Sequence, residues 1–127
     1  MTVTTCLIRM EKKMGRQLGK KAGTVALAGM GSMHVRFVLE NAESHPGVRW
    51  VWADEPESIW EEENQRAEVI REELKRGGVE QFSEKRDRDD LLGVMVLTGD
   101  GSRRRDEYER WSRFGVPVYL DKPVALE

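Results

Sequence analysis

The sequence predicts an α/β fold, in which a single domain forms a doubly wound parallel sheet of the Rossmann-like type. Short apolar segments rich in β-forming residues alternate along the chain with segments that carry apolar residues at helical spacing. The strand-like segments are apolar at nearly every position, as expected for a parallel sheet that helices cover on both faces. The first of these segments ends in a glycine-containing loop that leads directly into a helical pattern, which is typical of this fold.

Five segments are predicted to be strands from their apolar composition and from the glycine, proline or acidic residues that bound them. They are residues 24–29, 48–54, 79–82, 93–99 and 116–121, of which 79–82 is expected to be a short edge strand. The polar stretch 83–92 between two of them is expected to hold one helical turn. Right-handed crossovers between the strands would place helices on both faces of the sheet.

Three helices are predicted: from about Ser32 to the His-Pro-Gly turn 45–47, from Pro56 to about Arg76, and from Ser102, a potential cap, to about Phe114. The residues expected to face the sheet share helical spacing. They are Val35, Val38, Leu39 and Ala42 in the first helix, Trp60, Ala67, Ile70 and Leu74 in the second, and Tyr108, Trp111 and Phe114 in the third. The residues expected to face solvent are Glu61–Glu63, Glu72–Glu73 and Arg103–Arg105. The alternative for Arg103–Arg105 is contact with a cofactor phosphate.

Composition excludes several classes of protein. The chain has 127 residues, 39% of them hydrophobic and 35% charged, which suits one globular domain. No apolar stretch is long enough to span a membrane. The single cysteine, Cys6, excludes an intramolecular disulfide and a cysteine-cluster metal site. We therefore expect a cytoplasmic protein with no membrane partner.

Residues 1–23 form a basic leader, which we expect to be disordered, and residues 24–127 form the predicted domain. The leader holds six basic residues against one acidic residue, a net charge of +5, so the rest of the chain carries −7 to give the total of −2. A body with that charge is a poor nucleic-acid surface. The alternatives for the leader are a weak targeting or membrane-surface segment and an over-extended start of the chain.

The loop after the first strand has the outline of a dinucleotide-binding turn. Gly29 allows a tight turn out of the strand, and Gly31 has no side chain to keep a pyrophosphate from the backbone. Ser32 and Met33 begin a helix whose free N–H groups favour an anion. His34 replaces the third glycine of the G-x-G-x-x-G pattern; it either lines the cofactor cleft or packs at the helix start.

Asp54 supports the same interpretation. It ends the second predicted strand, 23 residues past Gly31, near the spacing of the acid that binds the adenosine ribose. A carboxylate there repels a 2′-phosphate, so NAD is favoured over NADP. The alternative for Asp54 is a turn residue at a strand end.

Other site classes find no support in the sequence. No P-loop pattern and no G-x-S-x-G pattern is present. His45 lies in the His-Pro-Gly turn and no second histidine stands at metal-ligand spacing, so no metal site is expected. A methyltransferase that uses S-adenosylmethionine stays compatible with the first half of the chain.

The end of the chain carries a more specific pattern. The stretch "GVPVYLDKPVA" ends a predicted strand in Asp121-Lys122-Pro123, and the stretch "GVMVLTG" precedes it. With the glycine loop and Asp54, these stretches resemble the Gfo/Idh/MocA family of NAD(P)-dependent oxidoreductases over about residues 24–125. The family typically has a Glu where Asp121 stands.

The resemblance implies a cofactor domain and a set of contacts. Gly29, Gly31, Ser32 and Met33 would surround the pyrophosphate, with Asp54 at the ribose and Thr98 near the cofactor. Lys122 would lie beside the nicotinamide and substrate, as the catalytic residue. At the carboxyl end of a parallel strand, a lysine could polarise a carbonyl or relay a proton; the alternative is a surface lysine.

Members of this family carry a second α/β domain after the Lys-Pro strand, and this sequence is expected to lack it. Two hypotheses follow. One is an NAD-binding domain that transfers hydride to or from a sugar, polyol or related alcohol only with a complementing chain. The other is a non-catalytic nucleotide sensor or interaction module, or a remnant that binds no nucleotide. In either case an exposed apolar face would favour self-association or a partner.

Overall fold

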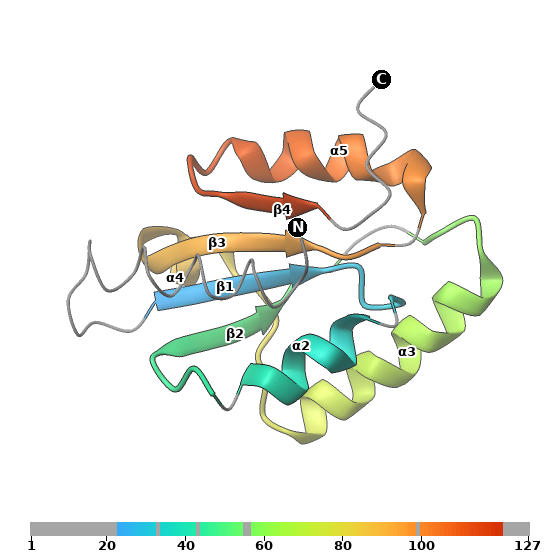
Figure 1. The fold of residues 1–127 in the computed structure, drawn as a ribbon, viewed down its shortest axis with the longest axis horizontal. Coiled ribbons are helices and arrows are strands. Elements are labelled where there is room, and N and C mark those ends of the chain that lie inside the picture. The colour runs from blue at the N-terminus through green and yellow to red at the C-terminus, as the bar shows by residue number, and fades with distance from the viewer. Residues whose placement is uncertain (1–22, 33, 43, 55–56, 99, 121–127) are drawn as a thin grey trace.

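The computed structural model describes residues 23–32, 34–42, 44–54, 57–98 and 100–120. In this part of the chain four parallel strands form one sheet in the order β2-β1-β3-β4 (Figure 1). The strands are β1 (Gly23–Ala28), β2 (Val48–Trp52), β3 (Leu91–Val96) and β4 (Val118–Leu120). The predicted α/β class is therefore confirmed.

The predicted edge strand 79–82 is reduced to a single parallel bridge between Gln81 and Trp52. The Trp52 amide donates to Glu80 O at 3.1 Å, and the Phe82 amide donates to Trp52 O at 2.7 Å. This segment therefore lies beside β2, on the side away from β1. The chain runs outward from β1 in one direction and then outward from β3 in the other, which defines a doubly wound sheet with its switch point between β1 and β3.

Helices cover both faces of the sheet. The helical elements are α2 (His34–Ala42), α3 (Glu61–Arg76), α4 (Glu84–Asp87), a 3₁₀ turn (Arg88–Asp90) and α5 (Gly101–Ser112). Helices α2 and α3 lie on one face, and α5 lies on the other (Figure 1). Within the described ranges, none of the helices has the length and apolar character needed to cross a membrane.

Alternation along the strands divides the core into two layers. In β1, Val25 and Leu27 pack against α2 and α3, while Ala26 and Ala28 face α5. The small alanines leave room for Trp111 of α5, which is fully buried. The phenyl rings of Phe82 and Phe114 pack against the Trp111 indole, with centroids 4.9 and 5.5 Å away.

Helix α3 begins later than predicted, and burial at its start is the reverse of the prediction: Trp60 is exposed and Glu63 is buried. It starts at Glu61 rather than Pro56, which lies outside the described residues. Trp60 has extended backbone angles (φ −95°, ψ 111°) and is 58% exposed, so its predicted burial is wrong. Glu63, predicted to face solvent, is only 8% exposed. Because Trp60 is outside the helix, Glu63 is the first residue of the stripe that continues through Ala67, Ile70 and Leu74.

Helix α5 also departs from the prediction at its start and on one flank. Asp100, not Ser102, is the N-cap, and its carboxylate accepts the Ser102 amide at 3.1 Å. Tyr108 is 44% exposed, because the buried face consists of Arg104, Glu107 and Trp111. Arg104, expected to be solvated, donates from Nε to the Thr98 carbonyl at 3.3 Å.

A buried carboxylate connects β2 to α4. The Asp87 side chain is fully buried and accepts hydrogen bonds from Arg49 Nη1 at 2.7 Å, Arg86 Nε at 2.9 Å and the Ser83 amide at 2.9 Å. Burial acts to raise the pKa of Asp87. The hydrogen bonds from Arg86, Ser83 and Arg49 outweigh burial and hold that pKa well below its usual value.

Candidate functional site

The parallel register brings several of the predicted site residues to one edge of the sheet. Leu27 pairs with Trp52, and Ala28 pairs with Val96, so β1, β2 and β3 end together. The glycine loop follows β1, Asp54 follows β2 and Thr98 follows β3. We call this side, where the strands end, the carboxyl edge. Ligands of doubly wound sheets bind in the crevice at such an edge, next to the switch point.

Gly29 makes the tight turn that the sequence predicts. Its φ is +93°, in the left-handed region that favours glycine. A Cβ at this position would lie 2.3 Å from the Thr98 nitrogen. The missing side chain therefore lets the end of β3 approach the loop directly.

Gly31 is also in close contact with a neighbouring segment, which is the first turn of α3. A Cβ on Gly31 would lie 2.2 Å from the Glu63 carbonyl oxygen and 2.3 Å from Glu63 Cγ. Arg66 Nη1 donates to the Gly31 carbonyl at 2.9 Å. The first turn of α3 thus covers the glycine that was expected to face a pyrophosphate. Gly29, Met30 and Gly31 are all buried.

The Glu63 side chain extends from α3 to the end of β3. Its Oε1 accepts a hydrogen bond from Thr98 Oγ1 at 2.9 Å, and its Oε2 lies 3.3 Å from Ser58 Oγ. Thr98 is 1% exposed and its hydroxyl also accepts the Asp100 amide at 3.2 Å. Thr98 is therefore at the carboxyl edge as predicted, with its hydroxyl engaged by Glu63.

The connection Glu57–Trp60, between β2 and α3, is fixed to the start of α5 (Figure 1). The Ile59 amide donates to Asp100 Oδ2 at 3.1 Å, and Ser58 Oγ lies 3.2 Å from the same oxygen. Arg103 Nη1 donates to the Glu57 carbonyl at 2.8 Å. These contacts join segments about 40 residues apart in the sequence.

The carboxylate that holds this connection is stabilised in its charged form. Burial acts to raise the pKa of Asp100. Hydrogen bonds from Ser102, the Ile59 amide and Ser58 outweigh that effect, so the pKa lies below its usual value. Asp100 is thus an anion at neutral pH, 1% exposed and surrounded by donors.

The start of α2 matches the sequence prediction in part. Ser32 is 8% exposed, and its hydroxyl accepts the His34 amide at 3.1 Å, which orders the first turn of the helix. His34 is exposed and is the first residue of α2, so it does not pack against the sheet. Met33 lies outside the described residues.

Asp54 lies at the carboxyl edge, just after β2. It follows β2 by two residues and is exposed, and its carbonyl accepts Arg110 Nη1 at 2.9 Å. That backbone contact fixes the chain beside α5. Lys122, with its neighbours Asp121 and Pro123, lies outside the described residues.

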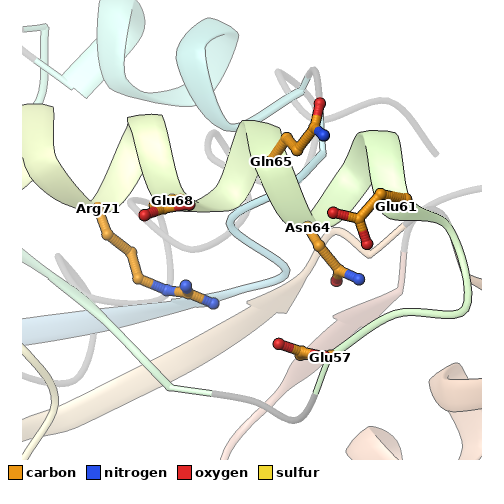
Figure 2. A pocket seen from close by; sticks show the side chains of 6 residues that line it. All are labelled: Glu57, Glu61, Asn64, Gln65, Glu68 and Arg71. Atoms are coloured by element: carbon orange, nitrogen blue, oxygen red, sulfur yellow. The ribbon is translucent and has the colours of Figure 1, made fainter.

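A cavity of about 360 Å³ lies along α3. Arg71 and Asn64 point from α3 toward Glu57 on the facing connection (Figure 2). The remaining lining residues are Glu61, Gln65 and Glu68. With three carboxylates and one guanidinium, this cavity disfavours phosphate groups. Among the described residues, no group of three or more His, Cys, Asp or Glu is placed to hold a metal.

Sequence reasoning missed Glu63 and Asp100, the two buried acids at this edge. The spacing of Glu63 from Ala67, Ile70 and Leu74 was the available signal, since it places Glu63 on the buried stripe. Asp100 precedes the predicted cap Ser102 by two residues, and an acid is an equally good cap.

Comparisons with known proteins do not identify a relative: no family model, curated protein or solved structure matches the chain. The resemblance to the Gfo/Idh/MocA oxidoreductases therefore remains a hypothesis that depends on the motif residues. In the described structure, Glu63 fills the space on the Cβ side of Gly31, where the resemblance would place a pyrophosphate.

Proposed function

We propose that this chain is a dinucleotide-binding domain whose ligand is NAD. One observation carries the proposal: the Gly29–Ser32 turn and the exposed Asp54 follow adjacent strands at the switch-point edge of a doubly wound sheet. That edge is where this architecture binds nucleotides, with the phosphates at the glycine turn and the ribose at the acid.

The choice of NAD over NADP rests on Asp54. A carboxylate accepts both hydrogen bonds of an unmodified ribose diol and repels a 2′-phosphate. The Arg110 guanidinium donates a hydrogen bond to the Asp54 carbonyl at 2.9 Å and lies over the Trp111 indole, 4.8 Å from the ring centroid. The choice of the unphosphorylated cofactor therefore depends on the charge of the Asp54 carboxylate.

The resemblance to Gfo/Idh/MocA oxidoreductases extends the proposal to chemistry. By that resemblance, Lys122 would act at the nicotinamide in hydride transfer to or from a sugar, polyol or related alcohol. A cytoplasmic location belongs to the same proposal.

A second candidate function is a non-catalytic interaction module, or a remnant that binds no nucleotide. The contact between Glu63 and Gly31 favours it, because the close approach that glycine permits is used within the protein. Among the described residues, Ile59 and Trp60 are large apolar side chains exposed at this edge, at 73% and 58%.

Calorimetric titration of NADH and NADPH into the purified chain tests the proposal. We expect NADH to bind more tightly than NADPH, and D54A to reduce that preference by about tenfold or more, a change of about 1.4 kcal/mol. The matched control is D89A, which removes an exposed carboxylate from the 3₁₀ turn before β3, at the opposite end of the sheet. An equal NADH preference in D54A and the wild type would contradict the ribose assignment.

A further inference from the structure

Glu63 occupies the place that the proposed function assigns to the cofactor's phosphates. Its backbone covers Gly31, and its carboxylate accepts a hydrogen bond from the Thr98 hydroxyl at 2.9 Å. Both groups would otherwise face the crevice at the switch point. A buried carboxylate among hydroxyl donors resembles a bound phosphate in charge and in hydrogen-bond demand.

We propose that Glu63 is a built-in competitor of the dinucleotide, so that the cofactor binds only when the first turn of α3 moves away from Gly31. This inference rests on the proposed function. It adds that the chain has a closed state, with Glu63 on Gly31, and an open state, with Gly31 and Thr98 free for the ligand. The described residues show the closed state.

The closed state is held mainly by polar contacts, which makes it reversible. The Ile59 amide and the Ser58 hydroxyl donate hydrogen bonds to the Asp100 carboxylate, and Arg103 donates one to the Glu57 carbonyl. The apolar side chains of this connection add little, because Ile59 and Trp60 are largely exposed. Opening it would expose little new apolar surface, and water would replace the lost hydrogen bonds.

The rest of α3 does not need to move for the edge to open. The buried residues Ala67, Ile70 and Leu74 anchor the helix one to three turns beyond Glu63. Fraying of the first turn, together with the connection before it, would suffice to expose Gly31. Helix ends open locally at low cost compared with helix centres.

Competition of this kind lowers the apparent affinity in proportion to the open fraction of the protein. Removal of the Glu63 side chain should therefore strengthen cofactor binding, whereas removal of a side chain that belongs to the binding site would weaken it. The matched control is Glu62, an exposed acid in the same helical turn. The variants E63A and E62A lose the same charge at nearly the same distance from the helix end.

The experiment measures NADH affinity by calorimetry and amide hydrogen exchange at Ile59 and Ser102, for wild type, E63A and E62A. In E63A we expect the NADH dissociation constant to fall by about ten- to a hundredfold, with faster exchange at both amides. E62A should match the wild type in both measurements. The variant E63Q keeps the shape of the side chain and removes its charge. Comparing E63Q with E63A separates competition by the negative charge from competition by the volume of the side chain.

The outcomes distinguish the inference, competition by Glu63, from the proposed function, binding of NAD. If E63A exchanges faster but neither it nor the wild type binds NADH, the proposed function fails, while the closed state held by Glu63 stands. If the wild type binds NADH and E63A binds it equally or more weakly, the competition is wrong and the function stands. If E63A changes neither exchange nor binding, Glu63 does not control this edge. Circular dichroism confirms that each variant is folded.

Discussion

The variant Gly31→Ala gives a direct test of how the carboxyl edge is packed. An added methyl group would lie 2.2 Å from the Glu63 carbonyl oxygen and 2.3 Å from Glu63 Cγ. Both separations are far inside van der Waals contact, and one partner is backbone, so α3 would have to shift. Overpacking of this kind costs about 1–3 kcal/mol, and we expect the upper part of that range. Urea unfolding followed by tryptophan fluorescence measures the change.

Two companion variants make the result specific to the Glu63 contact. Gly101→Ala adds a methyl in the first turn of α5, where the nearest atom, on Arg104, is 3.7 Å away; we expect a gain of about 0.5–1 kcal/mol from helix propensity and reduced chain entropy. In the background of Glu63→Ala, Gly31→Ala should cost less, because Cγ is gone and the first turn of α3 is freer to move. Coupling between contacting residues is about 0.5–3 kcal/mol.

The reasoning would be refuted if Gly31→Ala unfolds within about 0.5 kcal/mol of the wild type, the usual range for surface substitutions. A stable variant with weakened NADH binding would show that Gly31 is open and faces the phosphates directly. A destabilised variant whose loss is unchanged by Glu63→Ala would show that the clash is with the Glu63 backbone and not with its side chain.

Three further predictions concern the buried groups. Asp87→Asn should cost about 1.5–3 kcal/mol at pH 7 in urea unfolding, because the buried acceptor loses its charge, while the partly exposed guanidinium groups of Arg49 and Arg86 keep Glu80 as a partner. Since the pKa of Asp87 is lowered in the folded state, its contribution is fully present above its unfolded pKa of about 3.9 and is lost as pH falls below that value. The gap between variant and wild type should therefore narrow below about pH 4, and a gap constant down to pH 2.5 would contradict this. Trp111→Ala should cost about 3–5 kcal/mol by the same assay, and a loss under 1 kcal/mol would mean that the indole is not the centre of its core layer. Asp100→Ala should destabilise the protein by about 1–2 kcal/mol and speed hydrogen exchange at the Ser102 and Ile59 amides; unchanged exchange would show that the cap contacts are absent in solution.

The sheet could be predicted from the sequence because its strands are strongly apolar. The predicted strand 24–29 corresponds to β1 at Gly23–Ala28, and 93–99 corresponds to β3 at Leu91–Val96. Burial at nearly every position is what a parallel sheet covered by helices on both faces requires of its inner strands. The edge segment 79–82, with less apolar surface to bury, forms only one bridge.

The start of α3 could not be predicted from local signals. Pro56 followed by acidic residues is a reasonable helix start, yet the helix begins at Glu61. The connection before it is held by Asp100, whose carboxylate accepts the amide of Ile59, 41 residues earlier. Sequence patterns are judged over windows of about ten to fifteen residues. A contact between residues 41 positions apart cannot be predicted from such a window. Because the helix start was predicted five residues too early, Glu63 was assigned to the solvent face and was not included in the predicted site.

The glycine loop illustrates a limit of motif reasoning that follows from physics. A glycine between a strand and a helix indicates that something approaches the backbone closely, and the sequence does not say what that is. At Gly29 the close neighbour is the Thr98 backbone, and at Gly31 it is Glu63. A phosphate and a packed residue of the protein's own chain both require that the glycine has no Cβ, and both a phosphate and the Glu63 carboxylate accept hydrogen bonds from nearby hydroxyl groups. A chain that keeps the loop for a ligand and a chain that closes it with its own acid therefore have the same glycine spacing. The difference lies in the acid, since only in the second case does its removal strengthen binding.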